Sequence, residues 1–520
     1  MKAYLLGIDF GTGGAKACIT DERMEQLSYA FSEYPIFTDH PGWSEHDPER
    51  YWTTACRLIR ECIGKAKIDP KQIAGVAASS AKPSLVMVDR DGNPINRAYN
   101  LMDRRATAQA ARLEKLLGKD RIFRLTGDRL EDHPSMVNLL WEKENRPEDY
   151  ARIRKALDID GFITMKLTGV CQINNSGAPL FGVAYDLKRN CWDESILEQI
   201  GIDRAILPDV NACADVVGTV TPAAAEECGL APGTPVCAGQ VDCNAAWLGA
   251  GSLKDGDVQM NLGTCGNFGF LHQNTDFPDG MITIPYTIPG KLITVPTTTT
   301  GGQLIRYFRD TFCQMEAGAA DLTGQSVYGM IDMEADRIPA GSDGLVMLPY
   351  MMGERTPIWD TSARGVLFGL SLRHTKGHVA RAMMEAVAYA LYDSFYRIRE
   401  GNYPLNFPIV LNEGGAKSRI WRRIITDVLN VPTVLTESRT GAPYGDALLA
   451  GVACGAIDGF SAAAEKVRYQ SPMYPDPDAH ALYMDYFQIY QSLYRHLKED
   501  FRSLAAVSEK YSQKPEAGRE

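Results

Sequence analysis

YLLGIDFGTGGAKACIT, residues 4–20, predicts an apolar strand from Tyr4 to Asp9, a tight turn of residues 11–14 and a second strand through residues 17–20. Glycines favour such a turn because they reach backbone conformations that side chains hinder. Residues 258–270, VQMNLGTCGNFGF, repeat the pattern of apolar strand, Gly-Thr turn and apolar strand. We therefore expect two halves, each opening with a β-hairpin.

The chain of 520 residues exceeds what one hydrophobic core usually organises. Strand and helix patterns alternate in both halves, as in an α/β protein: Asp47-Pro48 predicts the start of a helix that is followed by a strand at 73–78, and the second half has strands at 344–348 and 408–411 with helices at 375–400 and after Ser418. The Gly-rich stretch 249–252 suggests a boundary, giving domains 1–252 and 253–507 and a flexible tail, 508–520.

Composition argues against several classes of protein. The net charge of −11 disfavours nucleic acid as a partner. No apolar run reaches the roughly 18 residues that span a bilayer, and the polar, Gly-rich start is unlike a signal peptide, so we expect a cytoplasmic protein without a membrane partner. The 12 cysteines form no Cys-x-x-Cys pair, and His374 and His378 flank a glycine with no acidic residue between them, which disfavours a zinc site.

The first hairpin could bind phosphate. Its glycines, Gly13 among them, would let backbone N–H groups approach a phosphate, while Thr12 adds a hydroxyl and Lys16 a cation. Asp9 suits a hydrated magnesium ion. The alternative is a plain hairpin turn, but a second turn at Gly263 and Thr264 would allow two facing hairpins to hold a polyphosphate.

Asp242 is a further candidate functional residue. It ends an apolar strand in PVCAGQVDCNAA, residues 235–246, before a small-residue helix. A carboxylate placed in this way could take a proton from a hydroxyl that attacks a phosphoryl group, because the transition state of phosphoryl transfer is loose. The alternative is that Asp242 merely caps the helix.

The longest signature lies in the second half: residues 352–360 (MGERTPIWD), 363–370 (ARGVLFGL), His374 and 381–386 (RAMMEA). Together with the hairpins, these stretches resemble the FGGY carbohydrate kinase family, as found in its xylulokinases. The resemblance implies two actin-like (ribonuclease H-like) ATPase domains with ATP and Mg²⁺ between them, a small-molecule sugar or polyol as acceptor, and Asp242 as catalytic base. A homodimer is possible.

The resemblance also implies nucleotide contacts in EGGAKS, residues 413–418, at Gly414, Gly415, Ala416 and Ser418. Glu413 stands where the family has a glycine, which predicts a tighter base pocket. On the sugar side, Lys82 replaces the methionine of a Met-His-Gly stretch and Asp103 is retained from Trp-Asn-Asp; both could bind substrate hydroxyls, as could Asp242.

These departures leave the acceptor open. A pentulose such as D-xylulose is the first expectation, and other ketoses, polyols such as glycerol or erythritol, and autoinducer-type compounds are alternatives. Two other classes of protein also stay open: an actin-like switch ATPase and a non-catalytic sugar-binding regulator.

Overall fold

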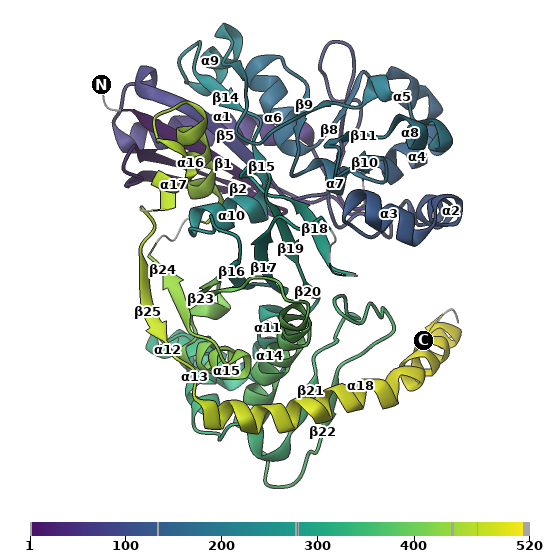
Figure 1. Cartoon of the computed structure of the whole chain (residues 1–520), viewed down its shortest axis with the longest axis vertical. Coiled ribbons are helices and arrows are strands. Elements are labelled where there is room, and N and C mark those ends of the chain that lie inside the picture. Colours follow the sequence, from purple (N-terminus) through teal and green to yellow (C-terminus); the bar gives the residue numbers. More distant parts are fainter. Residues whose placement is uncertain are drawn as a thin grey trace.

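The computed structural model describes residues 3–132, 135–275, 278, 280–437, 441–464 and 466–512. The chain folds into two α/β halves, one above the other in Figure 1, each built on a mixed sheet. No helix among the described residues is long and apolar enough to cross a membrane.

The upper sheet has the strand order β13-β14-β5-β1-β2-β3, with β15 also beside β5. β1 pairs with β2 in antiparallel fashion and with β5 in parallel fashion, so the predicted opening hairpin forms the centre of the sheet. The strands are β1 (Tyr4–Phe10), β2 (Gly14–Asp21), β3 (Gln26–Glu33), β5 (Ile73–Ser80), β13 (Val216–Thr219), β14 (Pro235–Cys237) and β15 (Gln240–Val241).

The helix predicted after Asp47 is α1 (Pro48–Ala66). The Asp47 side chain accepts a hydrogen bond from the Glu49 N–H, and Pro48 takes the first helical position, which needs no amide donor. Its buried face, which includes Tyr51, Trp52 and Leu58, packs against β2 and β3. This helix therefore covers one face of the upper sheet.

The lower sheet, of order β18-β19-β17-β16-β23-β24-β25 with β20 beside β17, repeats the central arrangement. β16 is antiparallel to β17 and parallel to β23. The strands are β16 (Asp257–Leu262), β17 (Gly266–His272), β18 (Ile282–Pro285), β19 (Leu292–Val295), β20 (Thr297–Thr298), β23 (Asn406–Asn412), β24 (Thr433–Thr436) and β25 (Tyr469–Met473). The repeated hairpin in the sequence thus corresponds to a repeated sheet centre.

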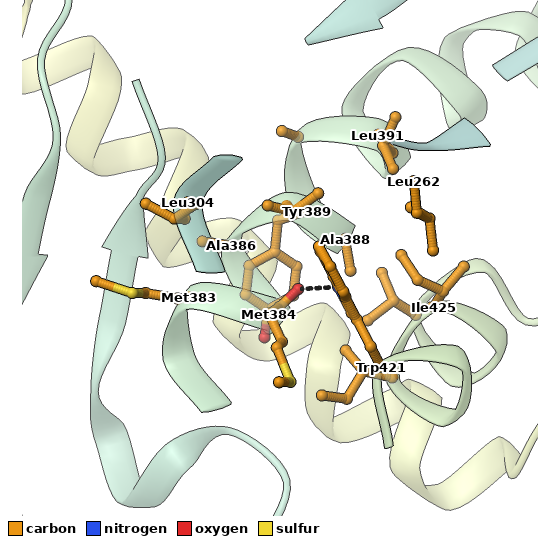
Figure 2. Close-up of a cluster of buried hydrophobic side chains, with 14 of the residues drawn as sticks. Leu262, Leu304, Met383, Met384, Ala386, Ala388, Tyr389, Leu391, Trp421 and Ile425 are labelled. Atoms are coloured by element: carbon orange, nitrogen blue, oxygen red, sulfur yellow. Dashed lines mark hydrogen bonds between the residues drawn. The ribbon is translucent and has the colours of Figure 1, made fainter. Parts of the chain in front are cut away.

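Two helices pack tightly against the lower sheet: α14 (Lys376–Glu400) and α15 (Arg419–Leu429). Figure 2 shows their contact, where Trp421 from α15 lies against α14 and its indole N–H donates to the Met384 carbonyl at 3.1 Å. Leu262, at the end of β16, belongs to the same buried cluster. The signature residues 381–386 therefore lie in the core of this half.

One helix crosses between the halves. α16 (Ala442–Ala453) comes late in the chain but packs on β1 and β5 of the upper sheet and on α10 (Asp242–Gly249). Glycines permit this packing: an added Cβ would lie 1.9 Å from the Pro443 oxygen at Gly7 and 1.8 Å from the Ala245 oxygen at Gly445. The boundary expected near Ser252 marks the change of sheet, but it does not separate all the contacts of the two halves.

The remaining described elements surround these layers. The predicted strand at 344–348 is β21, shortened to three residues and paired with β22, and α18 runs along the lower edge in Figure 1. α18 continues five residues into the tail expected from 508, because residues 508–512 contain good helix formers; residues 513–520 lie outside the described part. The other elements used below are α6 (Ile159–Thr168), α7 (Ala178–Phe181), β9 (Gln172–Asn174), α11 (Gly302–Phe312), β21 (Val346–Leu348), β22 (Val366–Phe368) and α18 (Pro477–Ser512).

Candidate active site

The first hairpin turn, residues 11–14, is fixed by hydrogen bonds within the turn and from Tyr34. The Gly11 N–H donates to the Gly14 carbonyl at 3.0 Å, and the Tyr34 N–H donates to the Gly13 carbonyl at 3.3 Å. The Tyr34 hydroxyl also donates to the Gly11 carbonyl. A Cβ added at Gly13 would meet no atom within 4 Å, so this side of the turn is open to a ligand, and Thr12 is partly exposed beside it.

Asp9 lies at the end of β1 with its carboxylate almost entirely buried. The Ser79 hydroxyl is 3.2 Å from Asp9 Oδ1, and Lys16 Nζ is 3.6 Å from Oδ2. Burial raises the pKa of Asp9, while the Lys16 ammonium acts in the opposite direction. The structure therefore places Asp9 and Lys16, which the sequence suggested as magnesium and phosphate contacts, next to each other beside this turn.

Sequence reasoning did not single out Asp446, which α16 carries into this region. The carboxyl group of Asp446 is buried and contacts two residues of the upper half, with Ser79 Oγ at 2.7 Å from Oδ2 and Gln240 Nε2 at 2.9 Å from Oδ1. Burial raises its pKa well above the ordinary value. Residues 441–447 resemble a segment that closes the nucleotide site in the family, and Asp446 is the acidic residue of that segment.

Asp242 is the first residue of α10, directly after β15. The helix N-cap is Val241 and makes no side-chain cap bond, whereas Asp242 Oδ1 accepts from the adjacent Cys243 N–H at 2.7 Å. Capping therefore does not explain the aspartate. Burial raises the pKa of Asp242 to about 7, with a further increase from Asp9 and opposing effects from Lys82 and Lys16. A carboxylate with such a pKa suits general base catalysis near neutral pH.

The two predicted sugar contacts are paired with protein groups. Lys82 Nζ contacts the carboxylates of Asp158 and Asp160 in a buried cluster. Asp103 accepts from the Ser44 N–H at 2.9 Å and forms an ion pair with Arg105. Sequence patterns could not reveal the partners of Lys82, because they lie 76 and 78 residues away in the chain.

The second hairpin turn, Gly263 to Cys265, is crossed by a glycine pair at the start of α11. The Gly301 N–H donates to the Thr264 carbonyl at 3.0 Å and the Gly302 N–H to the Gly263 carbonyl at 2.5 Å. A Cβ at Gly301 would lie 2.4 Å from the Cys265 backbone, so only glycine allows this crossing.

Residues of the predicted nucleotide segment have different surroundings. Gly414 has open space where a Cβ would lie, whereas a Cβ at Gly415 would come within 2.8 Å of Leu262 and Trp421. Ala416 is buried in the core. Ser418 caps α15, accepting from the Trp421 N–H at 3.1 Å. Gly414 is thus the member of this set with room beside it for a ligand.

Glu413, from the lower half of the molecule, lies near residues of both hairpins. It has a positive φ of 72°, and a Cβ at Gly263 would lie 3.6 Å from its Cγ. Its charge also raises the pKa of Asp9 in the other half. The end of β23 and the end of β1 therefore approach the same region, beside both hairpin turns.

The signature loop contributes a buried carboxyl group that sequence analysis did not assign a role. Glu354 accepts from the Thr298 hydroxyl at 2.5 Å, the Thr299 N–H at 2.8 Å and the Arg355 N–H at 2.7 Å. Burial raises the pKa of Glu354 to about 7. These bonds connect the loop to β20 and to the short irregular segment, residues 299–300, that leads to Gly301. His378, near this half's edge, forms a capping box with Thr375 at the start of α14.

Comparisons with known proteins agree over nearly the whole chain. Residues 4–249 match the N-terminal domain of the FGGY family of carbohydrate kinases, and residues 258–454 match the C-terminal domain. The xylulose kinase of Bacillus subtilis (strain 168) is 28% identical over 499 residues, covering 95% of this chain and 97% of that protein. The gluconokinase of the same organism is 28% identical over 508 residues, covering 97% and 98%.

Among solved structures, the xylulose kinase from Rhodospirillum rubrum superposes with a TM-score of 0.88 at 26% identity, covering 96% of this chain and all of that one. The chain therefore has the two-domain actin-like fold of this solved kinase, as the sequence analysis predicted.

Proposed function

The chain belongs to the FGGY family of carbohydrate kinases, and we propose that it phosphorylates a pentulose such as D-xylulose with Asp242 as the catalytic base. Phosphorylation of a sugar hydroxyl with ATP as donor follows from the family. This activity sets aside the switch ATPase and the non-catalytic regulator. The pentulose and the roles of individual residues are the proposed part.

The observation that carries the base assignment is the environment of Asp242. Its carboxylate lies at a strand end, is half-buried, and has a pKa raised to about 7 by burial. In the proposed step, the acceptor hydroxyl gives its proton to Asp242 while its oxygen forms a bond to the γ-phosphorus of ATP. The bond from that phosphorus to the bridging oxygen breaks, and ADP leaves with the electron pair.

The two turns would bind the phosphates of ATP. Backbone N–H groups of the turns, the Thr12 and Thr264 hydroxyls and the Lys16 ammonium provide donors to phosphate oxygens. Gly414 would face the adenosine, where its missing side chain leaves room. Gly415, Ala416 and Ser418 would support that turn from the core side.

Asp9 fits a magnesium site of the kind that uses one carboxylate together with phosphates and waters. Among the described residues, its carboxylate has the Ser79 hydroxyl as a donor and the Lys16 ammonium 3.6 Å away. Mg²⁺ held there would neutralise phosphate charge. The acidic surroundings, with Asp9, Glu413 and Asp446 in one region, favour the magnesium complex of ATP over free ATP.

Charge pairing favours a neutral acceptor over an aldonate. Both predicted polar contacts on the sugar side, Lys82 and Asp103, are matched by charges of opposite sign within the protein. A substrate carboxylate would therefore find no spare cation at Lys82, and Asp242 would repel it. We expect D-xylulose to be phosphorylated and D-gluconate to be a poor substrate; other ketoses, glycerol, erythritol and autoinducer-type compounds are the next acceptors to test.

The test is an ADP-coupled assay over these acceptors with wild-type protein and Asp242→Asn. We expect ATP consumption that depends on the sugar, and a loss of at least about 10³-fold in kcat in the variant with sugar and nucleotide binding preserved. Asp209→Asn, an exposed aspartate of the same half, is the matched control. Near-normal turnover in Asp242→Asn would remove the base assignment, and turnover of gluconate above all ketoses would remove the pentulose.

A homodimer is also proposed. The strand β22 has β21 as its only hydrogen-bonded neighbour among the described strands, and Leu367, Phe368, Leu370 and Leu372 are exposed along and after it. Light scattering should give twice the chain mass, falling to the single mass in Leu370→Asp/Leu372→Asp. A monomeric wild-type protein at micromolar concentration would contradict the proposal.

A further inference from the structure

Lys82 occupies a closed compartment of the upper half. Its side chain is 2% exposed, and Nζ contacts carboxylates of both Asp158 and Asp160. Gly177, just before α7, closes the compartment: a Cβ there would lie 3.0 Å from both Cε and Nζ of Lys82. An ammonium group enclosed in this way has little room for a sugar hydroxyl.

The cluster continues as a chain of hydrogen bonds. Asp160 Oδ2 accepts from Asn174 Nδ2 at 2.7 Å, and Asn174 Oδ1 accepts from the Ser176 hydroxyl at 2.7 Å. Ser176 Oγ in turn accepts from the Val241 N–H at 3.1 Å. Val241 is the residue before Asp242, so the chain runs from the lysine to the backbone of the catalytic segment.

A second path reaches the same point. The other oxygen of Asp160, Oδ1, accepts from the Ser80 hydroxyl at 2.6 Å. Ser80 is the register partner of Val241 in the parallel pair of β5 and β15. Asp160 therefore supports the backbone before Asp242 from two directions, and it can do so as a buried carboxylate only while a cation compensates its charge.

We propose that Lys82 is a positioning residue for the base: by holding Asp160, it fixes Asn174, Ser176 and the Val241 backbone, and thereby the direction of the Asp242 carboxylate. The inference rests on the proposed role of Asp242. It replaces the expectation that Lys82 donates a hydrogen bond to the substrate.

Lys82 also affects Asp242 through its charge, which lowers the pKa of the Asp242 carboxyl group. The charged and titratable groups that face Asp242 are Asp9 from β1, Lys16 from β2, Lys82 and the adjacent Cys243 thiol. Lys82 and Lys16 lower the pKa of Asp242 and Asp9 raises it. Removal of the Lys82 charge should therefore move the acidic limb of the pH–rate profile to higher pH.

The first experiment removes the last hydrogen bond of the series, the one from the Val241 N–H to Ser176. Ser176→Ala removes the acceptor of the Val241 N–H and leaves every charge in place. We expect kcat to fall about 10- to 100-fold, because small displacements of a reacting group have such effects, while KM for ATP and for the sugar stays within about twofold. Ser135→Ala is the control, since Ser135 is a buried serine of the same half whose hydroxyl donates to the Ser84 carbonyl outside this chain.

The second experiment changes the charge. Lys82→Met alone leaves two buried carboxylates unpaired and could prevent folding, so Lys82→Met/Asp160→Asn, which removes one charge of each sign, is measured beside it. In the double variant we expect lower kcat and an unchanged KM for the sugar, whereas the acidic limb should shift to higher pH only in folded Lys82→Met, which loses the positive charge alone. Circular dichroism and a thermal unfolding curve establish that each variant is folded.

Two results would overturn the inference. One is wild-type kcat in folded Ser176→Ala. The other is a Lys82 variant in which only the KM for the sugar rises, since this is the signature of a direct substrate contact. Full turnover in Asp242→Asn would instead remove the base role itself, so failure of the proposed function and failure of this inference are distinguishable.

Discussion

Gly445→Ala should both destabilise the protein and slow catalysis, because Gly445 sits where α16 touches the helix that begins with Asp242. A Cβ at this position would lie 1.8 Å from the Ala245 oxygen and 3.0 Å from the Gly249 N. Non-bonded atoms prefer separations near 3.5 Å, so the two helices must move apart by about 1.7 Å.

Overpacking of this kind typically costs about 1–3 kcal/mol of folding free energy. The variant should also react more slowly, because a displacement of about 1 Å in a reacting group can lower the rate about 10²-fold. We therefore expect kcat to fall about 10- to 100-fold in Gly445→Ala. Gly249→Ala should have a smaller effect of the same kind, since its closest contact is 3.0 Å.

The assay combines steady-state kinetics with urea unfolding. Gly64→Ala in α1 and Gly318→Ala in α12 (Gln314–Thr323) are matched controls, because an added Cβ meets no atom within 4 Å at either helical position. Alanine there should preserve kcat and add up to about 1 kcal/mol of stability. If Gly445→Ala behaves like these controls, the close packing of α10 and α16 does not control the base.

Three further changes have expected outcomes. The kcat/KM for the sugar should rise with pH through about 7 as Asp242 loses its proton, since only the ionised carboxylate accepts one; a profile flat from pH 6 to 8 would contradict this. Glu413→Gly should lower the KM for ATP several-fold, because it removes a negative charge beside Asp9 and a positive-φ side chain; an unchanged or higher KM would place the phosphates elsewhere. Glu354→Gln should cost about 1–3 kcal/mol in urea unfolding and raise the KM for ATP more than that for the sugar, since the amide oxygen can accept from the Thr299 and Arg355 N–H groups only by turning its NH₂ toward the Thr298 hydroxyl, which can then no longer donate; equal effects on both constants would argue against a role confined to the nucleotide side.

Local patterns in the sequence predicted the elements that local interactions determine. The hairpins around Thr12 and Thr264, the helix after Asp47 and the strand and helix around residues 406–429 form as expected, because turn glycines, caps and apolar periodicity act over a few residues. The crossing of α16 onto the upper sheet was not predictable in this way. The packing depends on Gly7, Gly249 and Gly445, which lie far apart in the sequence. The lack of a side chain at each matters only because the folded chain brings another segment into close contact there.

The same limit applies to Lys82, for which the family resemblance predicts a hydrogen bond to the substrate. Its partners Asp158 and Asp160 lie 76 and 78 residues away in the chain, so no local sequence pattern reveals them. A buried charge needs an opposite charge beside it. A sequence alone does not tell whether that opposite charge comes from a ligand or from another residue of the protein. Here the protein supplies it twice, at Lys82 and at Asp103, whereas Asp242 has no paired cation in contact and only the Cys243 N–H as a donor among the described residues. The carboxylate without a paired cation is the one free to take a proton, which is the property required of a base.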